Sequence, residues 1–215
     1  RNAKELLKVC QEQGLSISAV MLQRELTEGE QDPEETDRKM DRVLAIMKSA
    51  ASTPIHTPVK SMGGLIGGEA KKISDHKDTG KGLCGDLLER AVIYAMETLE
   101  TNASMGVIVA SPTAGSAGIV PGLLLALQET YDLSDEQIKQ GLYNASAIGY
   151  LAMRNATVAG AVGGCQAEVG IASAMAASAT VELMGGSPEQ SLAAASTVLM
   201  NMLGLVCDPV GGLVE

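Results

Sequence analysis

Residues 170–184 read GIASAMAASATVELM, and residues 192–202 read LAAASTVLMNM. Both stretches consist largely of Ala, Ser and Met and carry almost no charge. Alanine has the highest helix propensity, and small side chains allow the axes of packed helices to come close together. We therefore expect two central helices here, each buried on most sides.

The rest of the chain also favours helices. Its 215 residues include no Phe and no Trp but 24 Gly and 11 Met, so small and flexible side chains must fill the core. Ser, Asp and Pro residues mark helix starts, and no segment shows clear period-two alternation. Helices are expected over 3–13, from Ser16 or Ser18 to Leu26, from Pro33 to Met47, over 86–100, over 119–130, from Asp135 past Leu151, and over 188–203. The predicted fold is an all-α multi-helix domain.

Residues 51–85 break this helical pattern. Pairs of Gly and Thr-Pro dipeptides punctuate the segment, which predicts a long glycine-rich loop region. Because no second composition shift follows, we expect one domain over 1–215. Residues 1–50 would form peripheral helices, and residues 86–215 the functional core.

Charge and hydropathy exclude several classes of protein. A net charge of −10 and a pI near 4.7 argue against nucleic-acid binding, which requires clustered Lys and Arg. The sequence contains no run of 18 apolar residues, so it predicts no membrane span, and its first residues do not resemble a signal peptide. Four irregularly spaced cysteines do not suggest a disulfide framework. We expect a cytoplasmic protein.

Two glycine-flanked cysteines give the clearest indication of chemistry. Cys165 lies in GGCQAEVG, and Cys207 lies in GLVCDP. Neighbouring glycines leave a thiolate open to a bulky inorganic group, and thiolates bind soft or borderline metals. The two residues are too far apart in sequence for a zinc knuckle or a ferredoxin motif, so the fold must assemble any shared centre.

Residues 110–118, ASPTAGSAG, combine three hydroxyl side chains with Pro and Gly between two helical segments. Backbone N–H groups in such a turn can bind a carboxylate or phosphate. A plain linker rich in turn-forming residues is an equally good interpretation.

Two polar residues lie near Cys165 in the sequence. Asn155 is positioned to orient a small polar ligand, although a helix end with an ordinary glycine-rich exit explains this segment more simply. Glu168 follows Cys165 by one helical turn and would share its face. It is a candidate for proton transfer or for support of a metal ligand, and a solvated first-turn glutamate is the alternative.

The other cysteines and histidines carry less information. Cys10 lies on the apolar face of the first predicted helix and is most simply a core residue. His56 and His76 show no metal-ligand spacing, and Cys84 reads either as a second glycine-flanked thiol or as the lead into a helix. We assign none of these four to the predicted centre.

Three motifs together resemble a known family: SPTAGSAG at 111–118, GGCQAEVG at 163–170 and LGLVCDPVGGLVE at 203–215. They resemble the alpha chain of bacterial iron-sulfur L-serine dehydratase, the L-serine ammonia-lyase that does not use pyridoxal phosphate. The resemblance implies an oxygen-labile 4Fe-4S cluster held by three cysteines. Cys165 and Cys207 match the first two, and the third would follow Glu215, so we expect the chain as given to be truncated and inactive alone.

The resemblance also implies the reaction and its partners. An open iron would assist departure of the β-hydroxyl of L-serine while a base removes the α-proton, and the products are pyruvate and ammonia. Ser111, Thr113 and Ser116 would help to hold the substrate carboxylate. The base is expected on a separate beta chain, with Glu168 as a weak candidate in this chain. An oligomer with a role in amino-acid metabolism and gluconeogenesis is implied.

Two other functions are compatible with the sequence. One is a related iron-sulfur lyase such as an L-cysteine desulfidase, which would release sulfide instead of water. The other is a helical assembly or ligand-binding subunit without catalysis. Pyruvate formation from serine or cysteine separates the two enzymes, and absence of an iron-sulfur absorption band would favour the third function.

Overall fold

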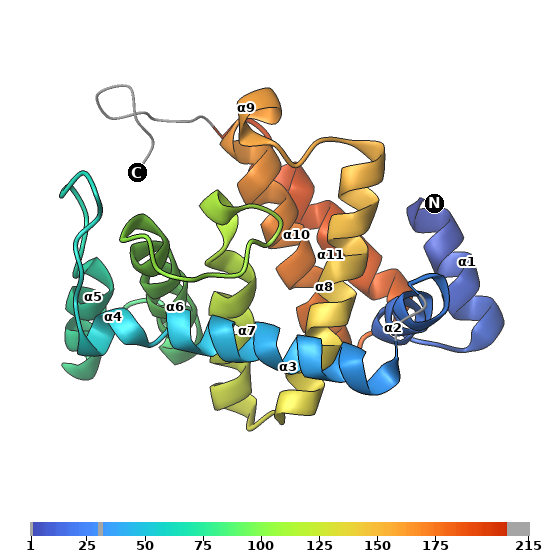
Figure 1. The fold of residues 1–215 in the computed structure, drawn as a ribbon, viewed down its shortest axis with the longest axis horizontal. Helices are drawn as coiled ribbons and strands as arrows, with labels where there is room; N and C mark the ends of the chain where they lie inside the picture. Colours follow the sequence, from blue (N-terminus) through green and yellow to red (C-terminus); the bar gives the residue numbers. More distant parts are fainter. Residues whose placement is uncertain (1, 30–31, 206–215) are drawn as a thin grey trace.

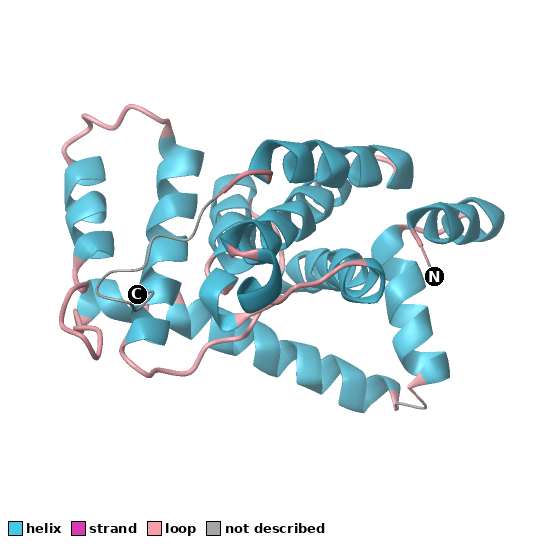
Figure 2. Ribbon diagram, turned by 90° about the horizontal axis from the view of Figure 1, so that it is seen from above, coloured by secondary structure: helices cyan, strands magenta, loops and turns pink. Residues whose placement is uncertain are grey.

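The computed structural model describes residues 2–29 and 32–205, and within these ranges it contains helices and no strand (Figures 1 and 2). The elements are α1 (Ala3–Gln13), α2 (Ile17–Glu28), α3 (Pro33–Ala50), α4 (Thr53–His56), α5 (Glu69–Asp78), α6 (Asp86–Ala103), the 3-10 turn η1 (Ala114–Ser116), α7 (Ile119–Tyr131), α8 (Asp135–Asn155), α9 (Gly160–Gly163), α10 (Cys165–Leu183) and α11 (Pro188–Met202). The predicted all-α fold class is confirmed.

Local sequence signals explain where several helices begin. Ser16 caps α2, and Asp32 caps α3 with Pro33 in the first turn. Ser134 and Ser187 each form a complete capping box at α8 and α11. These side chains satisfy backbone N–H groups that have no partner within the helix.

Helix α10 lies at the centre of the bundle and packs against α7, α8 and α11 (Figure 1). Its buried side chains are mostly small, and two glycines of α8 face it closely. A methyl group at Gly141 would lie 3.0 Å from Leu183, and one at Gly149 would lie 3.1 Å from Met175. The prediction of a central buried helix over 170–184 is therefore confirmed.

A buried polar network fixes the register between α2, α8 and α10. The side chain of Asn144 donates to Glu182 at 2.7 Å and accepts from Ser178 at 2.6 Å. Glu182 also accepts from the backbone N–H of Ile17 at 3.0 Å, in the first turn of α2. Because buried polar groups are costly unless paired, this network favours one alignment of the three helices.

The prediction for the second alanine-rich stretch is wrong in one respect. Residues 192–202 form part of α11 as expected, but only Ser191 and Ala195 of this helix are buried. The side chains of Leu199 and Met200 are 39% and 66% exposed. Alanine composition indicates close packing on one side, here against α10, and does not establish that the opposite side is covered.

The prediction of one long loop over 51–85 is also wrong. The segment contains α4 and the ten-residue α5, which packs against α6. Glycines lie on both sides of α5, Gly67 and Gly68 before it and Gly80 and Gly82 after it, and its sequence EAKKISDHKD has no clear apolar periodicity. Its Ala70 is fully buried, so tertiary contact stabilises a helix that the sequence pattern does not predict.

Two apolar clusters fill the interior. The larger joins α3, α7, α8 and α10, and a smaller one joins α1 and α2 to α8 through Cys10, Ile17 and Met21. Cys10 is 2% exposed, and its burial, together with nearby Glu182, raises the pKa of its thiol. The prediction that Cys10 is a core residue is confirmed.

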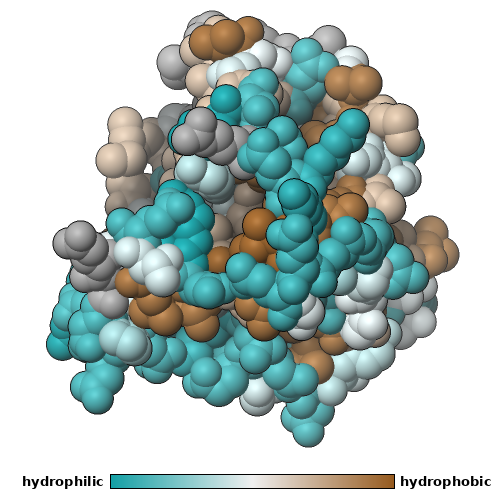
Figure 3. Space-filling view, turned by 90° about the vertical axis from the view of Figure 1, so that its right-hand side faces the viewer, coloured by the Kyte–Doolittle hydropathy of each residue, from teal (hydrophilic) through white to brown (hydrophobic). Residues whose placement is uncertain are grey.

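The outer side of α1 and α2 is hollowed. Figure 3 shows apolar side chains gathered between polar ones on this face. A groove of about 770 Å³ lies there and is lined by residues of α1, α2 and α8.

Among the described helices, none is both long enough and apolar enough to cross a bilayer.

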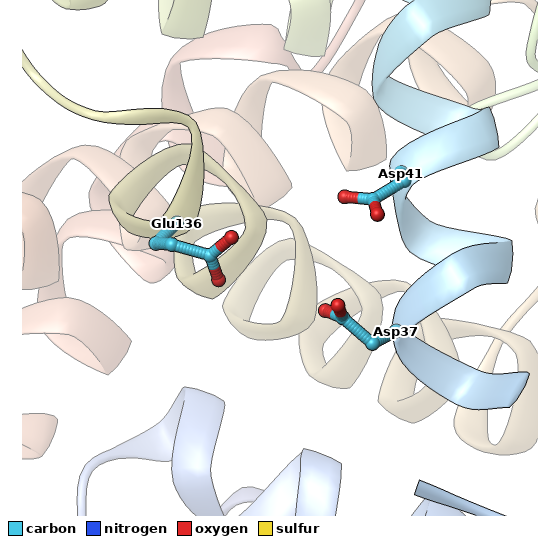
Figure 4. A group of neighbouring side chains, drawn as sticks. All are labelled: Asp37, Asp41 and Glu136. Atoms are coloured by element: carbon cyan, nitrogen blue, oxygen red, sulfur yellow. The ribbon is translucent and has the colours of Figure 1, made fainter. Parts of the chain in front are cut away.

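A lysine bridges α3 to the start of α8. Figure 4 shows the carboxylates of Asp37 and Asp41 on α3 and of Glu136 on α8 pointing toward one space. The Lys139 ammonium fills that space, 2.6, 2.9 and 2.8 Å from these three groups. Burial alone lowers the pKa of Lys139, but the carboxylates outweigh this and hold it above its usual value. Lys139 therefore offsets part of the charge of the three carboxylates and holds them around one ammonium group.

Substitution of Lys139 tests this bridge. In Lys139→Met the three carboxylates would repel each other without a counter-ion, although their exposure lets water screen part of the charge. We expect the free energy of unfolding to fall by about 1–3 kcal/mol, measured by urea denaturation. Lys8→Met, at an exposed pair on α1, should change it by less than about 0.5 kcal/mol. Equal effects of the two substitutions would contradict this interpretation.

Candidate functional site

Cys165 is the first residue of α10, and its side chain is half-buried. It follows Gly164, whose φ of 73° lies in the left-handed region that favours glycine. The N-terminal end of a helix carries partial positive charge. Cys165 therefore lies at the positively polarised end of α10, and its role as a metal ligand stays a prediction.

The residue after Cys165 joins the start of α10 to the end of α11. Oε1 of Gln166 accepts a hydrogen bond from the backbone N–H of Gly204 at 2.9 Å. One turn further along α10, a methyl group at Gly170 would lie 3.3 Å from Cβ of Met202. These two contacts bring the chain beyond α11 back to the beginning of α10. Cys207 itself lies outside the described residues.

The predicted anion-binding turn precedes α7 and is internally bonded. Ser116 is 1% exposed, and its hydroxyl donates to the carbonyl of Ser111 at 3.3 Å. The hydroxyls of Thr113 and Ser116 lie 3.2 Å apart. Ser111 is also buried and precedes Pro112 through a cis peptide bond. Of the three predicted hydroxyls, only that of Thr113 belongs to a half-buried residue.

Glu168 connects this turn to the cysteine. Its carboxylate lies against two glycines: a methyl group at Gly115 of η1 would be 3.4 Å from Oε2, and one at Gly160 of α9 would overlap with it. Glu168 is half-buried in the first turn of α10, three residues after Cys165. The structure therefore brings Cys165, Glu168 and the 111–118 turn to one end of the bundle.

The remaining sequence candidates are placed elsewhere or are otherwise engaged. Asn155 is exposed at the end of α8, where its Nδ2 donates to the carbonyl of Leu151 at 2.8 Å. This bond accounts for one of its side-chain donors. His56, at the end of α4, and His76, on α5, are exposed, as is Cys84 before α6.

A pocket of about 440 Å³ lies beside the turn. Ser111 and Pro112 line it together with methionines from α3 and α10, including Met47 and Met175. The Ser111 hydroxyl has no hydrogen-bond partner within the described part of the chain. The pocket wall is largely apolar, so it supports the turn by packing and provides few polar contacts.

The last turns of α6 hold the turn and the glycine-rich segment together. Asn102 donates to the carbonyl of Ala114 at 3.1 Å. Glu100 accepts from the backbone N–H groups of Gly68 and Ala70, at 3.0 and 2.8 Å. Segments 57–70 and 111–118 are thus attached to the same helix.

Glu97, one turn earlier on α6, accepts from the N–H of Ile55 at 3.1 Å and is fully buried. Burial raises the pKa of its carboxyl from 4.5 to about 7, and the charge of Glu100 adds to this shift. The N–H of Ile55 opposes the shift by stabilising the charged form. The glycine-rich segment is therefore anchored by a carboxyl that titrates near neutral pH.

Sequence reasoning missed several contributors to this site. Gln166 was quoted within the cysteine motif but given no role, because its partner is distant in sequence. Asn102 and Gly160 carry no local signal at all. A polar residue directly after the candidate cysteine was the one sign that could have drawn attention to Gln166.

An all-α bundle that gathers a helix-terminal thiol, a carboxylate and a hydroxyl-bearing turn has the composition of an enzyme site for a small polar ligand. Comparison with known proteins gives the family of the chain. A family model described as "Serine dehydratase alpha chain" matches residues 12–215. The chain belongs to the serine dehydratase alpha chain family, whose members are lyases.

Individual relatives match nearly the whole chain. A "Probable L-serine dehydratase, alpha chain" of Bacillus subtilis is 48% identical over 215 residues, covering 100% of this chain and 71% of that protein. The "L-serine dehydratase, alpha chain" of Peptoniphilus asaccharolyticus is 44% identical over 213 residues, covering 99% and 73%. The "L-serine dehydratase TdcG" of Escherichia coli is 34% identical over 219 residues, covering 100% and 48%.

The raised pKa of the Glu97 carboxyl predicts how the stability of the folded protein depends on pH. In the folded protein it keeps its proton up to about pH 7, whereas in the unfolded chain it ionises near pH 4.5. The folded state therefore binds more protons between these values, and its stability falls as pH rises through them. We expect ionisation of Glu97 to lower the free energy of unfolding by about 2–3 kcal/mol by pH 8. This loss should be absent from Glu97→Gln.

Urea denaturation of both proteins at pH 5, 6, 7 and 8 measures the difference. The wild type should lose stability relative to Glu97→Gln across this range, while Glu12→Gln, an exposed change on α1, should follow the wild type. Parallel curves for wild type and Glu97→Gln would show that Glu97 is ionised at all four pH values.

Proposed function

We propose that this chain is the alpha subunit of an iron-sulfur enzyme that deaminates L-serine to pyruvate and ammonia. Membership of the serine dehydratase alpha chain family supports the reaction. The single observation that carries the iron-sulfur part is the hydrogen bond between Gln166 and Gly204, which holds the end of α11 beside Cys165.

The donor set fits a cluster. Cys207 follows Gly204 by three residues, so the covalent chain keeps their Cα atoms within about 11 Å. Thiolates are the usual protein ligands of iron-sulfur clusters. We propose that Cys165 and Cys207 bind a 4Fe-4S cluster, that a cysteine beyond Glu215 is the third ligand, and that residues 86–215 form the cluster-binding core of one domain. No pyridoxal phosphate is required.

The other residues of the site fit recognition of an amino acid. When bound, a cluster with one open iron supplies a Lewis acid for the departing β-hydroxyl. The 111–118 turn would hold the substrate carboxylate through Thr113 and backbone N–H groups. Ser111 and Ser116 would act by shaping the turn, because both are buried. A role for Asn155 in binding remains a prediction.

We propose that a beta subunit completes the enzyme and supplies the base that removes the α-proton. The Escherichia coli and Streptomyces coelicolor relatives, both named L-serine dehydratase, are matched over only 48% and 47% of their length. About half of each therefore corresponds to sequence outside this chain. Leu199 and Met200 on α11 are apolar and exposed, which fits a surface that contacts the beta subunit. Thiolate ligands fit a reducing, cytoplasmic location.

The experiment is an anaerobic reconstitution of the full-length protein with its partner, iron and sulfide. We expect absorption near 400 nm, and formation of pyruvate from L-serine. Cys165→Ser should lose the absorption and lower pyruvate formation by more than about 100-fold, because a cluster ligand is removed.

Cys84→Ser is the matched control, since Cys84 is exposed, glycine-flanked and away from the site. It should keep both the absorption and the activity of the wild type. Retention of the cluster in Cys165→Ser would refute the ligand assignment. Preference for L-cysteine with release of sulfide would refute the substrate, and absence of any cluster in the intact complex would favour a non-catalytic subunit.

A further inference from the structure

The carboxylate of Glu168 occupies a confined position between three segments. It projects from the first turn of α10, and its Oε2 would lie 3.4 Å from a methyl group added at Gly115 of η1 and 2.3 Å from one added at Gly160 of α9. At Gly160 even a methyl group would overlap with this oxygen. The absence of a side chain at Gly160 therefore leaves the space that the carboxylate occupies.

Glu168 differs from the other interior carboxylates of the protein. Glu97, Glu100 and Glu182 each accept at least one backbone hydrogen bond. Among residues 2–29 and 32–205, no hydrogen bond or ion pair involves the Glu168 carboxylate. A half-buried carboxylate without a partner in the described chain can accept a hydrogen bond from a cationic group of a ligand.

We propose that Glu168 binds the α-ammonium group of L-serine. This inference rests on the proposed function, which directs the substrate hydroxyl toward Cys165 and the carboxylate toward the 111–118 turn. Glu168 lies between these two points, three residues from Cys165 and with its Oε2 3.4 Å from where a Cβ of residue 115 would be. Its charge is opposite to that of the third substituent on the α-carbon.

Three separate contacts on one α-carbon have a stereochemical consequence. D-serine could keep only two of these three contacts at a time, so its ammonium, its carboxylate or its hydroxymethyl group would be misplaced. Glu168 is then a binding residue that determines specificity for L-α-amino acids, distinct from the base on the partner subunit.

The test compares reconstituted holoenzymes carrying Glu168→Gln, Gly160→Ala and Glu12→Gln. Loss of one charge-assisted hydrogen bond should raise KM for L-serine about 10- to 100-fold while kcat changes much less. Gly160→Ala keeps the charge but displaces the carboxylate, and it should raise KM in the same direction. Glu12→Gln should resemble the wild type. Absorption near 400 nm shows that each variant keeps its cluster.

The inhibitor 3-hydroxypropionate, which lacks the α-ammonium group, provides a second readout. Glu168→Gln should not weaken its inhibition, so the variant should lose discrimination between L-serine and this analogue. An unchanged KM, or a fall in kcat at constant KM, would overturn the assignment.

Calorimetric titration separates this inference from the proposed function. If the wild-type complex formed no pyruvate, the proposed reaction would fail, and binding of L-serine could still be measured. Weaker binding of L-serine by Glu168→Gln, with unchanged binding of 3-hydroxypropionate, would support the ammonium contact. Equal binding of L-serine by wild type and variant would refute it.

Discussion

The close approach of neighbouring helices to α10 determines where every other part of the site can lie. A methyl group added at Gly141 or Gly149 of α8 would lie 3.0 or 3.1 Å from side chains of α10, and one at Gly170 would lie 3.3 Å from α11, so the neighbouring side chains would have to shift. Small residues permit this approach, and the network of Asn144, Ser178 and Glu182 fixes its register. A shift of α10 along its axis would move Cys165 relative to both the 111–118 turn and the end of α11.

The anchors on α6 add a second constraint. Glu97 and Glu100 hold backbone N–H groups of a segment rich in glycine, and Asn102 holds the turn that precedes α7. The glycine-rich segment and the candidate substrate-binding turn are therefore both attached to α6. Titration of Glu97 near neutral pH would alter the attachment of the segment without directly affecting the cysteine end of the site.

The parts of the fold that sequence predicted were those specified locally. Ser16, Asp32, Ser134 and Ser187 mark helix starts because each capping residue satisfies N–H groups only a few residues away. The small side chains of α10 permit its close packing against three neighbouring helices. The helix α5 escaped prediction because it is stabilised by contact with α6, and the exposure of α11 because composition does not specify how many sides of a helix are covered.

The site shows the same division. Cys165, Glu168 and the 111–118 turn could be singled out from residue type and spacing, but the bond from Gln166 to Gly204 joins residues far apart in sequence and emerges only in the fold.

The close approach of the Glu168 carboxylate to Gly160 has an evolutionary consequence. A larger residue at 160 would displace the Glu168 carboxylate unless the residue at 168 were shorter. We therefore expect the residue types at 160 and 168 to covary among related sequences.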